Sequence, residues 1–254
     1  MQVTLGGLTF HSGVLPGSTG FTIAAQSGWT GGAGSKRDNA GREGAHGSFR
    51  TPSHRPDRIF TYRGIYKGSS LADVQAMGEV LSGLEGLSLP VTVAWEDTRW
   101  STVEVNHVRF TPAGYKAEAD YQVELWMPDP FKYGESRDMP VSSGDSVTFG
   151  NIVQLSHRGN TAALPKFTVT ATTSMTSGYQ LKGKSRTFEV PGPLDVGSTD
   201  KVDYSTGTVR RDGVLVTGVV PRVFEVNGGE SVDFRLWPLS GAGKAIPHIT
   251  DTYQ

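Results

Sequence analysis

The chain has 254 residues, which is enough for one large β domain or two domains of ordinary size. Charged residues make up 19% and hydrophobic residues 36%, and this balance excludes both a disordered polyelectrolyte and a membrane-embedded protein. The formal net charge of -1 gives no global field that would favour a protein that coats nucleic acid. Because there is no cysteine, disulfide frameworks, thiol catalysis and cysteine-based zinc sites are excluded together.

The composition favours a mainly β protein outside the membrane. The 33 glycines and 14 prolines indicate many turns, as in all-β folds. Residues 1–4 lack the basic region and apolar core of a signal peptide. No apolar run approaches the ~18 residues of a membrane span. We therefore expect synthesis in the cytoplasm and no membrane insertion.

The first third combines short strands with a long polar segment. Strands are predicted at 3–10 and 20–25, and residues 27–58 are rich in Gly, Arg, His and Ser. Such a segment is too long for an ordinary connection. We interpret 27–58 as an extended arm ordered by contact with a neighbouring molecule; a plain surface loop is the alternative.

One helix is predicted at 70–85, after a strand at 59–66. Ser70 and Asp73 have the spacing of a capping box, in which the first side chain caps the helix start. An apolar stripe follows at steps of three and four residues, which predicts one face packed on a sheet. The stripe consists of Leu71, Val74, Met77, Leu81 and Leu84.

The clearest strand in the sequence covers 117–127 and follows a predicted strand pair at 91–95 and 103–110. Apolar and polar residues alternate along it, so one face is buried and the other meets water or a partner. The polar face is acidic and carries Glu118, Asp120 and Glu124. The run stops at the Pro-Asp-Pro sequence of 128–130.

A linker is expected at 131–145, which separates a first domain at 1–135 from a second at 146–254. The second half contains only short strands divided by turn signals such as 227–229, a pattern typical of a jelly-roll β-sandwich. We expect the segment 240–254 to fray or to pair with a neighbour. The predicted strands are 147–155, 166–171, 179–182, 186–190, 201–204, 208–211, 214–216, 222–226 and 232–237.

The sequence shows no motif for catalysis, a cofactor or a metal. The six histidines lack the H-x-x-x-H spacing of helical zinc sites, and neither a nucleophile elbow nor a phosphate-binding loop is present. Glu118 and Asp120 lie close enough on one strand face for a glycosidase pair, but such acidic faces are usually solvated. No catalytic, cofactor-binding or metal-binding residue is predicted.

The arm is basic. Residues 36–67 contain eight basic and three acidic residues, an excess of five positive charges. Because guanidinium groups bind carboxylates bidentately, we hypothesise that the arm pairs with the acidic strand face of an adjacent copy; a solvated loop is the alternative. The arm residues in this hypothesis are Arg42, Arg50, Arg55 and Arg58.

Several short motifs occur in an order that resembles the distal tail protein (Dit-like) family of long-tailed, non-contractile phages. They are His-Gly-Ser-Phe-Arg at 46–50, Asp-Pro-Phe-Lys-Tyr at 129–133, the Val-Asp-Tyr-Ser-Thr-Gly-Thr-Val run at 202–209 with Asp-Gly after it, and Val-Asn-Gly-Gly-Glu-Ser at 226–231. The resemblance covers 3–237. One departure is the Asn-Thr-Ala sequence at 160–162, where the family has a glycine.

The resemblance implies a fold, an assembly and partners. The first domain would be a tail-tube-like β-sandwich or barrel with one α-helix, and the second a galectin-like jelly-roll sandwich. Six copies would form a ring at the distal end of the virion tail, and its channel would pass DNA without specific binding. The ring would join the tail tube protein to baseplate hub or tail tip proteins, contact the tape measure protein, and carry or dock receptor-binding proteins. The family implies no enzyme activity and no cofactor.

Two other functions compete with this structural role. The second domain could act as a carbohydrate-binding module of a tail tip, for which Tyr179, Tyr204 and Trp237 are the candidate stacking residues. The third hypothesis is a glycosidase or esterase on a jelly roll, for which the sequence offers no nucleophile.

Overall fold

The computed structural model describes residues 1–13, 15–36, 54–183, 186–221 and 224–254. The chain divides into two compact units, Met1–Lys132 together with Gln254, and Tyr133–Tyr253. Each unit is built around its own cluster of buried hydrophobic side chains. In the part of the chain that is described, no helix is long and apolar enough to cross a membrane.

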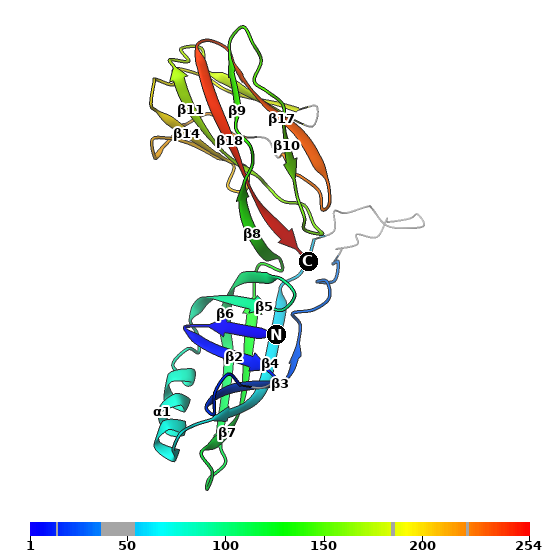
Figure 1. Ribbon diagram of the computed structural model, residues 1–254, viewed down its shortest axis with the longest axis vertical. Coiled ribbons are helices and arrows are strands. Elements are labelled where there is room, and N and C mark those ends of the chain that lie inside the picture. Colours follow the sequence, from blue (N-terminus) through cyan, green and yellow to red (C-terminus); the bar gives the residue numbers. More distant parts are fainter. Residues whose placement is uncertain (14, 37–53, 184–185, 222–223) are drawn as a thin grey trace, which may run out of the picture. The chain divides into compact units, whose positions relative to one another are not determined.

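The first unit is a closed β-barrel with one helix (Figure 1). Its strands follow the order β6-β5-β1-β2-β3-β4-β7, and β7 pairs with β6 to close the ring of hydrogen bonds. This confirms the predicted barrel with one helix. The elements are β1 (Gln2–Leu5), β2 (Leu8–Ser12), β3 (Gly20–Ser27), β4 (Arg58–Lys67), α1 (Leu71–Ser82), β5 (Ser88–Ala94), β6 (Thr98–Pro112) and β7 (Glu118–Met127).

The long strand β6 closes the barrel. Its first half pairs with β5 and its second half with β7, and the register shifts between Val105 and His107. An extra residue at such a bulge bends a strand and increases its twist. The bend therefore lets one strand pair with two different partners along its length.

Aromatic rings fill the barrel because each strand turns alternate side chains inward. The period-2 pattern predicted for β7 is confirmed, since every second residue from Ala119 to Met127 is buried. The ring of Phe10 lies 4.5 Å from Phe21 and 4.9 Å from Tyr62, measured between centroids. Tilted and edge-on contacts of this kind stabilise aromatic clusters beyond the area that they bury.

Gly64 permits the close approach of β3 to β4. A Cβ atom at this position would lie 1.7 Å from the carbonyl oxygen of Thr22. The same carbonyl accepts a hydrogen bond from the hydroxyl of Tyr121 at 3.1 Å. The wall of the barrel at this point therefore requires a residue without a side chain.

Helix α1 begins where the sequence predicts. The hydroxyl of Ser70 accepts the backbone N–H of Asp73 at 3.2 Å, and the Asp73 carboxylate accepts the backbone N–H of Ser69 at 2.7 Å. These bonds satisfy backbone donors that a helix start leaves free. Val74 and Leu81 are buried, whereas Leu71 is 49% exposed, so the buried stripe is shorter than predicted.

The second unit is a β-sandwich (Figure 1). One sheet has the order β16-β15-β14-β11-β18-β8, with β9 also paired to β18; the other has the order β10-β17-β12-β13. The mainly β fold is confirmed, and its galectin-like detail stays a prediction. The strands are β8 (Lys132–Asp138), β9 (Ser142–Asp145), β10 (Val153–Ser156), β11 (Lys166–Thr173), β12 (Tyr179–Gly183), β13 (Arg186–Val190), β14 (Thr199–Asp203), β15 (Thr208–Arg211), β16 (Val214–Leu215), β17 (Ser231–Pro238) and β18 (Ala242–Tyr253).

Side chains from both sheets meet in the core of the sandwich. Phe167 of β11 stacks on Phe234 of β17 with centroids 4.5 Å apart. The buried carboxylate of Asp200 accepts two hydrogen bonds from Arg211, each 2.8 Å long, and one from the hydroxyl of Tyr179. The buried charge is therefore paired and hydrogen-bonded, as a low-dielectric interior requires.

Two predictions about non-strand segments are wrong. The expected linker at 131–145 contains β8 and β9, and the expected fraying tail at 240–254 contains β18. Strand β18 pairs with β11 and β9, and Ile249 is the only large aliphatic side chain that it buries, the other buried residues being Gly243, Ala245, Pro247, Asp251 and Thr252. Because few large apolar side chains mark these strands and their pairing partners lie far away in the sequence, the local pattern does not reveal them.

Two predicted strands are shorter or absent. Of 147–155, only Val153–Ser156 forms a strand. Of 222–226, the described residues 224–226 contain a single bridge from Val226 to Ala163. In both places apolar residues lie in irregular segments, where no neighbouring strand pairs with them to support their β propensity.

Candidate assembly surface

The outward face of β7 carries the acidic side chains that the sequence places together. Glu118, Asp120 and Glu124 alternate with buried residues and point away from the barrel core. The Glu118 carboxylate lies 3.9 Å from Lys67, and Glu124 accepts a hydrogen bond from the Asn106 side chain. Asp120 makes no ion pair or side-chain hydrogen bond within the part of the chain that the structure describes.

Neighbouring strands add positive charge, so this face is mixed and not simply acidic. On β4, Arg63 lies opposite Gln122 of β7, and on β6, Arg109 lies opposite the same residue from the other side. Together with Asp120, these arginines line a shallow groove of about 540 Å³. A surface that presents both signs of charge can select a partner by charge complementarity.

Apolar side chains extend the same surface. Ile59 of β4 is 53% exposed and lies opposite Trp126 of β7, which is 36% exposed. The Trp126 ring nitrogen donates to Asp57. Aromatic residues of this kind supply much of the binding energy at protein interfaces. The outer wall formed by β4, β7 and β6, which we call the β7 face, therefore has the composition of an interface.

The basic arm is described only at its two ends. Arg42 and Arg50 lie outside the described residues. Lys36 and His54 exchange backbone hydrogen bonds of 2.9 and 3.0 Å, which join the two ends of the arm. Arg55, beside this bridge, donates to the carbonyl oxygen of Ala33 at 3.1 Å.

Arg58 is fixed inside its own barrel. It is the first residue of β4, is only 8% exposed, and donates to the carbonyl oxygens of Gly28, Trp29 and Gly31 at 2.6, 3.3 and 2.9 Å. Burial lowers the pKa of this guanidinium. Its contacts hold the loop after β3 against the barrel. We therefore assign Arg58 to the support of the arm and not to its outer contacts.

Lys132 forms a second buried cation beside Arg58, and sequence reasoning missed it. It is 3% exposed, and its Nζ donates to the Trp29 carbonyl oxygen at 2.9 Å. Burial, together with the nearby charge of Arg58, lowers the pKa of Lys132 to about 8. The sequence shows a lysine within the Asp-Pro-Phe-Lys-Tyr motif, but nothing there indicates that the side chain is enclosed.

The candidate residues for other chemistry are dispersed. The described residues hold no group of three or more His, Asp or Glu side chains suited to a metal ion. Tyr179 and Tyr204, two candidate sugar-stacking residues, are 0% and 5% exposed and belong to the core. Trp237 is half-buried, and Lys182 lies over its ring. The expected exposed platform for a sugar is therefore not formed by these three residues.

Comparison with known proteins shows what fold this is. No family model and no curated protein sequence matches the chain. Among solved structures, the crystal structure of SPP1 Dit matches with a TM-score of 0.73 at 13% identity, covering 100% of this chain and 99% of that one. That protein is described as a paradigm of the hub adsorption apparatus in phages that infect Gram-positive bacteria.

Two weaker likenesses are to the phage P2 baseplate. The structure of its activated conformation with Ca matches with a TM-score of 0.48 at 9% identity, covering 91% of each chain. The strontium form gives a TM-score of 0.46 at 9% identity over 97% of each chain. The SPP1 match alone shows that the present chain has the fold of SPP1 Dit over nearly the whole length of both chains.

Proposed function

We propose that this chain is a distal tail protein, a structural and non-enzymatic component of a phage tail. Six copies form a ring at the distal end of the tail, joining the tail tube above to the baseplate or tip proteins below. The ring leaves a central channel through which DNA passes without specific binding. The second unit lies outside the channel and carries or docks further tail proteins.

One observation carries this proposal: the fold matches SPP1 Dit along the whole length of both chains. A match to the barrel alone would fit many tube-like proteins, and a match to the sandwich alone would fit many binding modules. Because fold by itself does not define function, the proposal also needs a surface suited to assembly.

The β7 face supplies that surface. It combines the exposed Trp126 and Ile59 with carboxylates and guanidinium groups on adjacent strands. If this face meets a different face of the next copy, the contact is heterologous, and such contacts close into a ring when the rotation per copy divides a full turn. The basic arm is the segment that we expect to contact the acidic residues of the neighbour.

Reversing the acidic side of the β7 face should prevent ring formation. In the variant with Glu118, Asp120 and Glu124 all changed to Lys, the face becomes wholly basic, and we expect a monomer of 27.2 kDa in place of a six-fold larger species. Negative-stain images and solution mass measure the change, and circular dichroism checks that the barrel still folds.

A matched control changes Glu135, Glu189 and Glu225 to Lys. All three are exposed in the second unit, so the charge change is the same but the β7 face is intact. Rings should survive in this control. Rings that also survive in the first variant would show that the acidic residues of β7 take no part in assembly.

A charge exchange tests the arm itself. Changing Arg42, Arg50 and Arg55 to Glu should dissociate the ring, and combining this change with the lysine variant of β7 should restore it. Arg58 is kept, because its buried guanidinium holds the barrel loop. Loss of rings in the arm variant without recovery in the combined one would mean that the arm pairs with another surface.

A further inference from the structure

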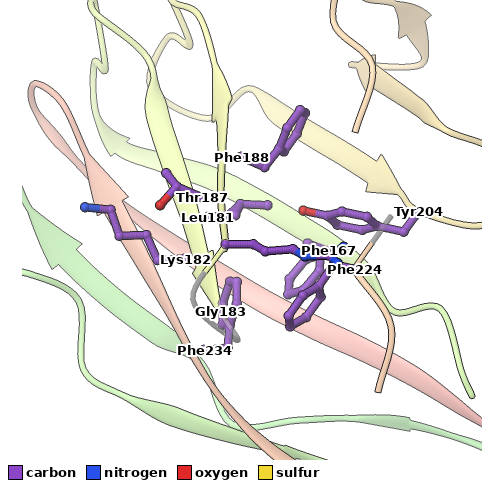
Figure 2. A pocket seen from close by; sticks show the side chains of 10 residues that line it. Phe167, Leu181, Lys182, Gly183, Thr187, Phe188, Tyr204, Phe224 and Phe234 are labelled. Atoms are coloured by element: carbon purple, nitrogen blue, oxygen red, sulfur yellow. The ribbon is translucent and has the colours of Figure 1, made fainter. Parts of the chain in front are cut away.

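The second unit contains a cavity of about 300 Å³ between its two sheets, beside β13. Figure 2 shows aromatic rings from several strands turned toward it. Phe167 and Phe234 form its floor by stacking on each other, while Phe224 and Tyr204 lie 5.8 Å apart and Phe188 and Tyr204 lie 6.0 Å apart. The volume is at the lower end for ligand pockets, which suits a single ring.

Polar and charged side chains also line this cavity. The Tyr204 hydroxyl belongs to its lining, and burial raises the pKa of Tyr204, so the group stays protonated and can donate. The lining also includes the Thr187 hydroxyl and the cationic side chains of Lys182 and Arg186. Five aromatic side chains and Leu181 form most of the lining. An aromatic side chain can pack against such rings and can stack on the guanidinium of Arg186. The lining therefore suits an aromatic side chain.

The strand beside the cavity is a sheet edge. Strand β13 is last in the order β10-β17-β12-β13, and in the described chain it pairs on one side only, with β12. An edge strand presents backbone donors and acceptors that an extended peptide can join. Phe188, in the middle of β13, lines the cavity. The inward side chains of a peptide added beside β13 can therefore reach the cavity.

The outward face next to this edge is basic. Lys182 lies directly opposite Arg235 on the paired strands β12 and β17, and Thr187 of β13 lies opposite Lys182. Two like charges in direct register repel each other, and an acidic group nearby relieves that repulsion. Asp233 lines the same outer groove, and Glu189 on β13 already accepts a hydrogen bond from Gln180 at 2.7 Å.

We propose that β13 receives an extended peptide from another tail protein as a fifth strand of this sheet. An aromatic side chain of the peptide enters the cavity, and the acidic residue next to it, which points to the opposite face of a strand, lies against Lys182. The inference deepens the proposed function, on which it rests for the source of the peptide, and it assigns the docking of a partner to one edge of the second unit.

The first test uses a synthetic peptide and the full-length protein. The probe is a capped seven-residue peptide of valine and threonine with a central phenylalanine preceded by one glutamate. We expect saturable binding in the range of about 10 to 500 μM, with amide chemical shifts that change along 186–190 and around Gly183. A peptide with serine for phenylalanine should bind at least about tenfold more weakly.

Two variants and a control locate the contacts. Lys182→Glu should weaken binding about tenfold, and Tyr204→Phe a few-fold, because they remove the charge and the hydroxyl that meet the peptide. Lys201→Glu carries the same charge change on an exposed residue of the opposite sheet and should leave affinity within about twofold.

Three results would overturn the inference: no saturable shift up to about 1 mM peptide, shifts away from β13, or equal binding of the serine peptide. Because peptide binding is measured apart from ring assembly, the two proposals fail separately. If the protein forms rings but does not bind the peptide, the proposed function stands and the proposed docking site is rejected.

Discussion

Changing Asp251 to Asn is expected to destabilise the second unit by about 3–5 kcal/mol, the usual cost of breaking a buried ion pair from one side. Asp251 is 3% exposed, and one of its oxygens accepts from Arg137 at 2.6 Å and from the backbone N–H of Arg158 at 2.9 Å, and lies 3.2 Å from Nδ1 of His157. The variant keeps the shape of the side chain but leaves the Arg137 charge uncompensated. This group ties β18 to β8 and to the segment after β10.

The same carboxylate gives a pH dependence with a defined sign. Burial opposes its ionisation, but the hydrogen bonds from Arg158, Arg137 and His157 outweigh burial and hold the pKa of Asp251 below its usual value. Its stabilising contribution is therefore complete above the unfolded-state pKa and is lost as the pH falls through the folded-state pKa. Hydrogen exchange of the β11 and β18 amides measures both the destabilisation caused by Asp251→Asn and the loss of stability at low pH.

Asp138→Asn is the control for this prediction. Asp138 pairs with His248, but its side chain is 72% exposed, so its removal should cost less than about 1 kcal/mol. If the amide hydrogens exchange equally fast in the two variants, the buried contacts of Asp251 do not stabilise the sandwich.

The barrel should become more stable by about 2 kcal/mol between pH 7.5 and 9.5 because of Lys132. Burial and the charge of Arg58 lower the pKa of Lys132 from 10.5 to about 8, so in this range the folded protein releases a proton that the unfolded chain still binds. Stability rises with pH wherever the unfolded state binds more protons. Tryptophan fluorescence reports the barrel, since four of the five tryptophans belong to it.

Lys132→Met isolates the cause. The variant keeps an unbranched side chain at the site without the ionisable group, so the rise of stability with pH should disappear. We expect the variant to be at least as stable as the original protein at pH 7.5, because a buried cation without a carboxylate is removed. An unchanged pH profile in the variant would assign the rise to another group.

The sequence predicts the barrel better than the sandwich, and the reason is physical. In β7 and α1 the buried positions carry large apolar residues at a regular period, so local pattern and tertiary packing agree. In β8 and β18 most buried positions carry small, polar or charged residues, such as Lys132, Gly243 and Asp251, with Ile249 as the one large aliphatic residue, and long-range pairing decides the structure. A pattern that counts large apolar side chains cannot detect such strands.

The candidate site was predicted in part. The acidic residues of β7 share one outward face, as their spacing requires, and this follows from strand geometry alone. The arginines of β4 and β6 that flank them could not be predicted, because the register between strands distant in sequence places them there. Arg58 looks like its neighbours in the sequence, yet the turn at 28–31 encloses it.

The two units suggest a division of roles. The barrel presents the β7 face, whose charges and exposed Trp126 suit contacts between copies, and the sandwich presents an aromatic cavity beside an open strand edge. In this view, assembly of the ring and docking of a partner depend on separate surfaces. Variants that affect one should leave the other intact.

The central claim is that copies of this chain surround a hollow axis. Electron cryo-microscopy of virions, with the second unit marked by an antibody fragment, tests it most directly. We expect six labels around the tail axis at the distal end of the tube, outside an open channel. A label that lies away from the axis, or a copy number that cannot form a closed ring, would contradict it.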